Sequence, residues 1–319
     1  MGRDFVFKTT DQLSQGDKSQ ICELFCEVYG KNMSREDFDR KYLCTPLGHS
    51  YHGLMMVDGR IRGAYNTVPY HYTYFGRETT FALSVDLMVD REHRGGPFNV
   101  SHMAELVYRA MRDDGIGFVF GFPNEASYLC VKKLLGWKDI GELDFYILPR
   151  NIGALIPRLR LVNCLWHLAA AAWVRWPQVR DGAAATYNIQ KVCDAGFEAH
   201  RYNGQHHRID VGEGGKCVYR TYTEEDGTRV LYVLDVHPLG RAFFQEAVQQ
   251  LYRRHSKSMD IMLYVGRLAF DPRPLLRVPA SRRPKPVRMC GRLLAPGAVD
   301  DRVFNMENWN VNLSNFDVR

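Results

Sequence analysis

The segment from Ser84 to Trp137 constrains the fold more than any other part of this 319-residue chain. A hydrophobic strand predicted at 84–89 runs into the turn Arg91-Glu92-His93-Arg94-Gly95-Gly96-Pro97, and a helix is predicted over about 100–114. A strand that enters a helix through a glycine turn leaves backbone N–H groups directed at one spot. Such a spot binds a pyrophosphate, so the segment predicts a nucleotide-like phosphate site.

The second half of this segment adds a strand at 117–122, then Asn124, then a helix that closes on Leu135-Gly136-Trp137. With these parts in this order, the chain resembles the GNAT superfamily of acyl-CoA-dependent N-acyltransferases. Val89 and Arg94-Gly95 match the start of the family's pyrophosphate loop, which is written Gln/Arg-x-x-Gly-x-Gly/Ala. The resemblance covers roughly residues 20–148 and implies acyl-coenzyme A as co-substrate.

The loop departs from the family pattern, because the two small positions after Arg94 fall on Pro97 and Asn99. A loop one residue shorter, using Gly95 and Gly96, restores part of the pattern. Proline has no N–H to offer, but its fixed φ suits the first turn of a helix. The alternative is an ordinary strand–helix–strand unit with a tight turn, since a lone glycine turn is a weak signal.

The segments before the loop predict two helices and a hairpin. Apolar residues at helical spacing predict a helix over 17–30, and Ser34 is expected to cap a second short helix with Asp37 three residues on. Asp58-Gly59 predicts a tight hairpin turn. The strands expected in this domain besides those above are 52–57, 61–69, 70–75 and 145–148.

The second half of the chain partly repeats this pattern. Strands are predicted at 217–222 and 229–235, then a helix at 240–255 and a strand at 259–265. His237-Pro238-Leu239-Gly240 stands where the glycine turn would be, so we interpret this part as a degenerate unit without its own CoA site.

The predicted fold class is therefore α/β with a mixed α+β sheet, in tandem GNAT-like domains whose central, mostly antiparallel sheets are flanked by helices. The expected domains are a GNAT acyl-CoA-binding domain at 1–150, a connecting helical linker at 151–185 and the degenerate GNAT-like domain at 186–319. A chain of 319 residues with 45% hydrophobic and 24% charged residues suits two globular domains.

The charge pattern and the cysteines bear on partners and location. The net charge is +6, and basic residues gather at 267–292 without the aromatic pattern of an RNA-binding motif. This favours an anionic small substrate, or simply a solvated surface, over nucleic acid. The eight cysteines show no Cys-x-x-Cys pair, which predicts no metal site and buried reduced thiols of a cytoplasmic protein. The N-terminus shows no signal-peptide hydrophobic run.

The segment 154–176 is the most membrane-like part of the chain. It contains Pro157 and several charged residues, which argue against a membrane-spanning helix. Its tryptophans are compatible with an interfacial helix, but a connecting helix packed between the domains is the preferred interpretation.

Acyl transfer to an amine needs a base, a polarised thioester and a way to protonate the thiolate. The resemblance places Leu87, Met88 and Val89 beside the thioester, and Asp86 where family members often have a carboxylate base. Strand alternation predicts Asp86 and Met88 on one face and Val85, Leu87 and Val89 on the other. The alternative for Asp86 is a structural hydrogen-bond acceptor, and His93 and His102 are weaker base candidates.

The general acid is assigned to Tyr128, because the position of the family's usual tyrosine is Lys132 here. Otherwise Tyr128 packs in the core and the thiolate leaves unassisted. Asn124 is predicted to bond the pantetheine amide, to cap the following helix, or both. The predicted CoA-binding residues are Leu87, Met88, Val89, Arg94, Gly95, Gly96, Pro97, Phe98, Asn124 and Lys132.

The predicted substrate-binding residues are Tyr65, Asn66, Tyr70 and His71, because aromatic and polar strand residues can stack on or bond a sugar. The tandem arrangement resembles sugar N-acyltransferases of bacterial lipopolysaccharide and O-antigen pathways. The expected acceptor is a nucleotide-linked amino sugar such as a dTDP-amino-dideoxyhexose. No metal and no nucleic-acid partner is expected. The alternatives are a non-catalytic GNAT-like binding or regulatory protein and an aminoacyl-tRNA-dependent transferase of the same fold.

Overall fold

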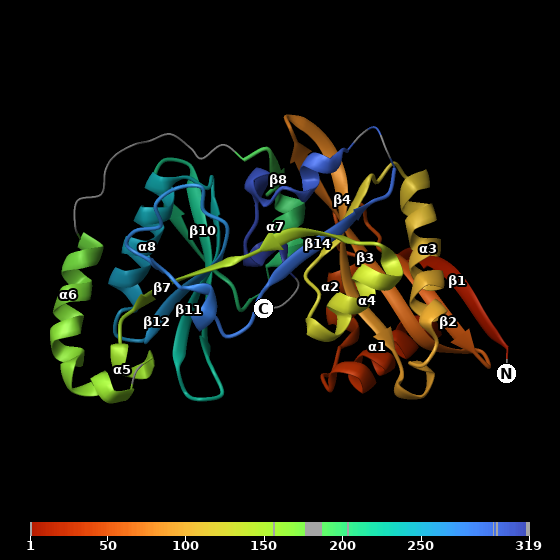
Figure 1. Ribbon diagram of the computed structural model, residues 1–319, viewed down its shortest axis with the longest axis horizontal. Coiled ribbons are helices and arrows are strands. Elements are labelled where there is room, and N and C mark those ends of the chain that lie inside the picture. The colour runs from red at the N-terminus through yellow and green to blue at the C-terminus, as the bar shows by residue number, and fades with distance from the viewer. Residues whose placement is uncertain are drawn as a thin grey trace. The chain divides into compact units, whose positions relative to one another are not determined.

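The computed structural model describes residues 2–155, 157–175, 187–202, 204–295, 297 and 299–316, and the chain forms two compact units (Figure 1). Unit 1 comprises 1–142, 188–201 and 287–309, and unit 2 comprises 143–187, 202–286 and 310–319. Neither unit is continuous along the chain. The expected contiguous domains at 1–150 and 186–319 therefore differ from the division made by the contacts.

Unit 1 is built on a mixed sheet. Along its main path the strands run β1-β2-β3-β4-β5-β14-β6, and β8 and β15 are attached beside β3. β4 and β5 are parallel, and the other ladders of this path are antiparallel. The strands are β1 (Arg3–Thr9), β2 (Tyr51–Val57), β3 (Arg60–Tyr74), β4 (Arg77–Val89), β5 (Phe118–Gly121), β6 (Lys138–Glu142), β8 (Ile189–Lys191), β14 (Arg288–Leu293) and β15 (Trp309–Asn310).

The helices of unit 1 begin and end at the residues expected of caps. Ser14 and Ser34 each accept a hydrogen bond from a backbone N–H three residues on, so the predicted cap at Ser34 is confirmed. Gly30 and Gly136 end their helices at φ of +67° and +65°, a conformation that glycine adopts without strain. The helices are α1 (Gln15–Tyr29), α2 (Arg35–Tyr42), α3 (Pro97–Asp113), α4 (Glu125–Leu135) and α7 (Ala195–Arg201).

The core of unit 1 lies between the sheet and α3. It includes Met103, Val107 and Met111 from α3, packed against Tyr65 and Tyr51 from the sheet. Removal of these side chains from water is the main force that holds α3 on the sheet.

Two strands of unit 1 differ from the sequence prediction. The segments 61–69 and 70–75 form one strand, β3, which runs through Pro69. Proline is tolerated there because the β2 ladder ends at Thr67 and the β8 ladder begins at Tyr72, which leaves that edge of β3 unpaired between them. The strand β14, distant in sequence, pairs with both β5 and β6.

Unit 2 repeats part of this topology on a second mixed sheet, ordered β13-β7-β12-β11-β10-β9. β10 and β11 form an antiparallel hairpin, and α8 then leads to β12, which is parallel to β11. β3, β4, α3 and β5 have the same order in unit 1. The elements are β7 (Asp144–Pro149), β9 (His207–Val211), β10 (Gly215–Thr223), β11 (Arg229–His237), β12 (Ile261–Gly266), β13 (Leu276–Arg277), α5 (Ile152–Leu155), α6 (Asn163–Arg175) and α8 (Arg241–His255).

Short 3₁₀ helices complete the described chain. They are η1 (Thr10–Gln12), η2 (Arg91–His93), η3 (Pro157–Val162), η4 (Ala280–Arg282), η5 (Asp301–Phe304), η6 (Met306–Asn308) and η7 (Leu313–Asn315). None of the described helices is long and apolar enough to cross a membrane. In unit 2, α6 packs against α8, and the Trp166 Nε1–H donates to the Pro149 carbonyl at 2.8 Å. Residues 156 and 176–185 of the predicted linker lie outside the described part of the chain.

All eight cysteines lie in the described residues and carry free thiols, as expected. The expectation that they are buried was wrong for Cys26, Cys44 and Cys164, which are exposed. Cys26 lies one helical turn from Cys22, but α1 turns Ile21 and Leu24 toward the interior instead.

Candidate active site

Strands β4 and β5 separate in the middle of the unit 1 sheet. Their parallel ladder joins Phe81 to Phe118 and ends at Leu83 and Phe120. β4 continues to Val89, so its last six residues have no ladder with β5. The opening places unpaired strand edge next to the turn that leads into α3, where the sequence predicted the thioester and the pyrophosphate.

A β-bulge coincides with this opening. Asn66 of β3 is opposite Val85, but Ala64 is opposite Met88, so Asp86 and Leu87 together face the single residue Tyr65. Asp86 has a φ of +44°, which non-glycine residues rarely adopt. Such backbone strain persists only where the surroundings hold it, and it gathers at functional sites.

The bulge corrects the predicted faces of β4. Strict alternation would place Val85 on the face opposite Asp86 and Met88. Residues that are opposite each other on neighbouring strands share a face of the sheet, however, and Val85 is opposite Asn66 while Met88 is opposite Ala64. Val85 and Met88 therefore lie on the same face. Leu87 and Val89 both pack against the core cluster that contains Met103 of α3, so these two residues share a face, as predicted. The extra residue of the bulge breaks the period of two.

The Asp86 carboxylate is held by two neighbouring residues of α2. The Tyr42 hydroxyl donates a hydrogen bond to it, and the Lys41 Nζ lies 2.5 Å from Oδ2. The Asp86 and Lys41 side chains are only 10% and 17% exposed, so water screens this pair weakly. A buried carboxylate with a cation and a phenol as partners is a candidate for proton transfer.

A chain of buried polar groups lies behind Asp86. The Asn66 Nδ2 donates to the Asp86 carbonyl at 3.0 Å, so its Oδ1 accepts from the His52 Nδ1 at 2.8 Å. The His52 Nε2 lies 2.8 Å from the Thr10 hydroxyl and, in that tautomer, accepts from it. These bonds fix the backbone at the bulge from the side opposite the opening.

Burial lowers the pKa of His52 to about 4, and it lowers the pKa of His200 to about 4 as well. Both imidazoles are neutral when folded, whereas an unfolded histidine takes up a proton near pH 6.5. The unfolded state therefore binds more protons between about pH 6.5 and pH 4. Above pH 6.5 neither histidine lowers the free energy of unfolding. As the pH falls from 6.5 to 4, protonation of the unfolded state lowers that free energy by roughly 3 kcal/mol for each histidine.

We therefore expect the free energy of unfolding to fall steeply from pH 6.5 to pH 4. The substitution His52→Gln should remove about half of the part of this slope that the two histidines cause. Urea unfolding at a series of pH values measures it. An unchanged slope in His52→Gln would show that folding does not lower the pKa of His52.

Two carbonyls at the β4 opening accept hydrogen bonds from side chains. The Tyr29 hydroxyl donates to the Leu87 carbonyl at 3.2 Å, and the Arg94 Nε donates to the Val89 carbonyl at 3.0 Å. Arg94 thus folds back on the strand from the predicted pyrophosphate loop. The predicted contacts of Leu87, Met88 and Val89 with a thioester stay a prediction.

The turn into α3 is organised by Asp90 and Asn99, both buried. Asp90 caps η2 by accepting from the His93 backbone N–H at 3.0 Å, and it also contacts the His93 ring. The Asn99 side chain donates to the His93 carbonyl at 3.0 Å. Asn99, which occupies a small position of the family loop, therefore faces inward and braces the turn.

The start of α3 suits an anion. Pro97 is the first helical residue, three positions before the predicted start of the helix, and within the described structure no side chain caps the N-terminus beginning at Gly96. A Cβ added at Gly95 would meet nothing within 4 Å, and Phe98 is 68% exposed. An open glycine turn that leads into a helix N-terminus fits a pyrophosphate.

The predicted acid and its neighbours form a group on α4. The Tyr128 hydroxyl donates to Asp139 Oδ1 at 2.9 Å, and the Lys132 Nζ lies 2.6 Å from Oδ2. The hydrogen bond to Asp139 raises the pKa of Tyr128, so the phenol stays protonated at neutral pH. Asn124 caps α4 by accepting from the Ser127 N–H at 2.9 Å.

The predicted substrate residues lie in different surroundings. Tyr65 is fully buried in the core, bonded to the Tyr108 hydroxyl at 3.0 Å. Asn66 belongs to the chain behind Asp86, and the Tyr70 hydroxyl lies 2.9 Å from the His200 Nε2. His71 is half-buried on the same strand. The structure thus brings Asn66 to Asp86 and leaves Tyr65 inside the core.

Sequence reasoning missed four residues of this site: Lys41, Tyr42, His52 and Thr10. Lys41 and Tyr42 end a short helix, and nothing in their spacing points to Asp86, 44 residues further on from Tyr42. His52 lies in an apolar strand run, where an isolated polar residue needs a hydrogen-bond partner, so the sequence alone could have pointed to His52.

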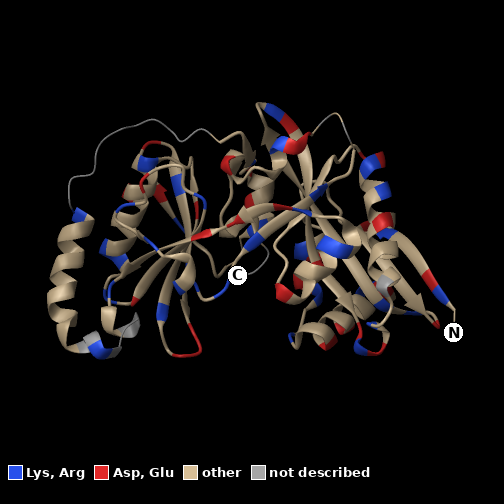
Figure 2. Ribbon diagram, in the orientation of Figure 1, with Lys and Arg blue, Asp and Glu red and all other residues tan. Residues whose placement is uncertain are grey.

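Most of the late arginines pair with acids. Figure 2 shows that basic and acidic residues are interspersed along the chain. Arg288 pairs with Glu142 at 3.2 Å, and Arg283 pairs with Asp144 at 2.6 Å. Among the residues that the structure describes, no group of three His, Cys, Asp or Glu side chains is placed to hold a metal ion.

Comparison with known proteins identifies the fold. Residues 9–136 match the family model described as an acetyltransferase (GNAT) domain. No curated protein matches the sequence. The matched residues contain the bulge, the turn into α3 and α4.

Solved structures resemble most of the chain. A GCN5-related N-acetyltransferase from Anabaena variabilis has 12% identity and a TM-score of 0.60, over 91% of this chain and 73% of that one. A probable N-acyltransferase of unknown function from Enterococcus faecalis has 12% identity and a TM-score of 0.62, with coverages of 92% and 73%. A GCN5-related N-acetyltransferase from Kribbella flavida has 14% identity and a TM-score of 0.57, with coverages of 91% and 71%. The predicted mixed α/β fold is confirmed.

Proposed function

We propose that this protein is an acyl-CoA-dependent N-acyltransferase whose reaction takes place at the β4 opening of unit 1. The observation that carries the proposal is the bulge at Asp86. It presents a buried carboxylate where β4 leaves β5, within the same GNAT domain as an uncapped helix start.

In this proposal the turn from Arg94 to Phe98 holds the pyrophosphate of CoA. The free N–H groups at the start of α3 donate to its oxygens, and the exposed glycine lets them approach the backbone. The pantetheine arm lies along the unpaired edge of β4, where Arg94 and Tyr29 now occupy the Val89 and Leu87 carbonyls. Asn124, at the start of α4, is the proposed partner of a pantetheine amide.

The proton movements follow from the chemistry of acyl transfer. The amine nitrogen attacks the thioester carbonyl, a C–N bond forms, and the C–S bond then breaks to release the CoA thiolate. Asp86 takes the proton that the amine loses, directly or through water, while Lys41 and Tyr42 hold the carboxylate in place. Tyr128 is the proposed donor to the thiolate. The Tyr128 hydroxyl now donates its hydrogen bond to Asp139, so proton donation to the thiolate requires that hydrogen bond to break.

The proposed acceptor is the amine of a nucleotide-linked amino sugar, such as a dTDP-amino-dideoxyhexose of an O-antigen pathway. This finer assignment is supported by the resemblance of the tandem arrangement and by the ββαβ order that unit 2 shares with unit 1. The competing functions are a binding protein without chemistry and a transferase that takes its acyl group from aminoacyl-tRNA.

Calorimetry with acetyl-CoA and a thiol-release assay test the proposal. We expect binding of acetyl-CoA, and release of CoA thiol when nucleotide-linked amino sugars are added. Absence of CoA binding would rule out the enzyme. Binding without turnover on any amine of the panel would favour the binding protein, and turnover only on simple amines would refute the sugar acceptor.

The substitution Gly95→Ala distinguishes an effect on CoA binding by the loop from an effect on the stability of the fold. It should leave the unfolding midpoint unchanged, because the added Cβ meets nothing within 4 Å. It should weaken acetyl-CoA binding about fivefold or more, because the methyl group keeps phosphate oxygens away from the backbone. Gly2→Ala, equally open in the structure, is the matched control. Equal affinity in both variants would place the pyrophosphate elsewhere.

A further inference from the structure

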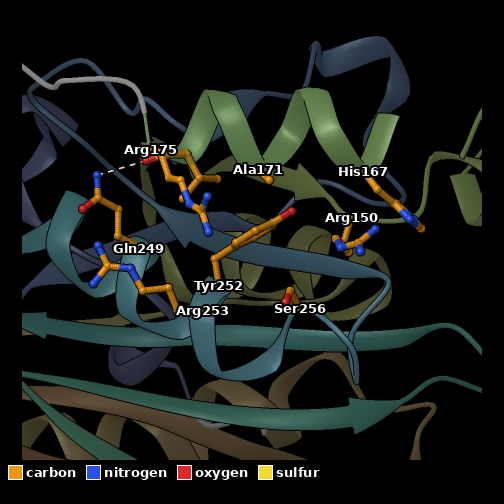
Figure 3. A pocket seen from close by; sticks show the side chains of 9 residues that line it. Arg150, His167, Ala171, Arg175, Gln249, Tyr252, Arg253 and Ser256 are labelled. Carbon is orange, nitrogen blue, oxygen red and sulfur yellow. Dashed lines mark hydrogen bonds between the residues drawn. The ribbon is translucent and has the colours of Figure 1, made fainter. Parts of the chain in front are cut away.

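A cavity of about 330 Å³ lies in unit 2 between α6 and α8 (Figure 3). Residues spaced by three or four positions on each helix face it, so each helix contributes one stripe of its surface. The cavity is lined by Arg150, His167, Ala171, Val174, Arg175, Gln249, Tyr252, Arg253 and Ser256. Gln249 ties the two helices together by donating to the Val174 carbonyl at 3.0 Å.

Arg150 is a half-buried cation at this cavity. Its Nε and Nη1 atoms are buried and have no hydrogen-bond partner among the residues of the structure. The Arg150 backbone is fixed, because its N–H donates to the Asp260 carbonyl at 2.8 Å directly after β7. Leaving two buried guanidinium nitrogens without acceptors is costly, so a ligand that accepts hydrogen bonds from them would be favoured here.

The charged side chains that line the cavity are all arginines. Three arginines and a histidine line it, without a carboxylate among the described lining residues. Arg229, elsewhere in unit 2, is instead paired with an acid, Asp260, at 2.8 Å. Burial raises the pKa of Tyr252, and the charges of Arg150 and Arg175 act to lower it, so both cations influence the phenol inside the cavity.

We propose that this cavity binds the phosphate group of a small phosphate monoester. The three arginines come from separate segments, namely the residue after β7, α6 and α8, and several guanidinium groups suit a tetrahedral dianion better than a planar carboxylate that one arginine can satisfy. The Tyr252 and Ser256 hydroxyls add neutral donors. The volume is at the low end of small-molecule sites and leaves room for an organic group beside the phosphate. The proposal does not depend on acyl transfer by unit 1.

Calorimetry on the full chain, without CoA and at constant ionic strength, tests the proposal. The ligands are ribose 5-phosphate, inorganic phosphate and ribose. We expect ribose 5-phosphate to bind most tightly and ribose not to bind. Equal affinity for ribose 5-phosphate and inorganic phosphate would assign the site to the free ion and overturn the monoester. Absence of binding by both phosphates would overturn the site.

Two variants tie the binding to the cavity. Arg150→Met and Arg175→Met should each weaken ribose 5-phosphate binding about tenfold or more, because each removes a charged hydrogen-bond donor. Arg282→Met removes an exposed arginine of unit 2 outside the cavity and should bind like the wild type. Arg175 is exposed, so its variant keeps the test valid if Arg150→Met fails to fold. Wild-type affinity in a folded Arg150→Met or in Arg175→Met would refute the proposal.

Discussion

Replacing Asp86 with asparagine is expected to lower kcat for acyl transfer by about 100-fold or more, because a general base contributes rate enhancements of that size. Asparagine has the same shape and can still accept the Tyr42 hydrogen bond, but it cannot take a proton. Acetyl-CoA affinity should stay within about twofold, since the proposed CoA contacts are backbone groups of β4 and the loop. Steady-state thiol release and calorimetry measure the two effects separately.

The stability of this variant must be known, because Asp86 also carries the ion pair with Lys41. Loss of one partner leaves the other charge buried, so some destabilisation is expected. Asp113→Asn, at an exposed aspartate of α3 in the same unit, is the matched control. Full turnover in Asp86→Asn would remove Asp86 as the base. Loss of CoA binding together with turnover would assign it the structural role instead.

Local patterns allowed much of the unit 1 fold to be predicted. The strand, glycine turn and helix around Gly95, the cap at Ser34 and the turn at Asp58-Gly59 all follow from the preferences of neighbouring residues. In the turn, Asp58 and Gly59 have positive φ, as such hairpins require. The prediction succeeded where a few adjacent residues decide the conformation.

Long-range pairing escaped prediction. β14 lies between β5 and β6, although it follows them by more than 140 residues. β7 was expected to close the first domain, but it pairs with β12 and β13 in the sheet of unit 2. An alternating strand pattern indicates which face is buried and does not indicate the partner strand.

The bulge at Asp86 escaped prediction for a related reason. It exists because β3 and β4 use registers that differ by one residue on its two sides. That offset is visible only when both strands are paired. In the sequence, Asp86 looks like an ordinary position of a regular strand. The contacts of Lys41, Tyr42 and Asn66 with Asp86 follow from the fold, and the sequence therefore indicated the base candidate without its partners.

Replacing Gly53 with alanine is expected to destabilise the protein by roughly 3 kcal/mol or more, the largest effect on folding that we foresee. Gly53 lies in β2 under α3. A Cβ there would lie 2.2 Å from the Met103 carbonyl oxygen and 2.8 Å from its carbonyl carbon. These are backbone atoms in the middle of a helix, so α3 as a whole would have to move away from the sheet. That movement opens the core at Val107 and shifts the loop at the start of the helix.

Gly63→Ala is the matched control, because Gly63 lies opposite Met55 on the adjacent strand β3 and also contacts Met103. An added Cβ there would lie 3.2 Å from the Met103 sulfur and 3.2 Å from the Met55 methyl group. Both are ends of flexible side chains that can turn aside, so we expect a loss of about 1 kcal/mol or less. Urea unfolding of the two variants compares them directly. Equal losses of stability would mean that α3 shifts on the sheet as easily as a methionine side chain rotates. In that case the close contact between α3 and β2 does not determine where α3 starts.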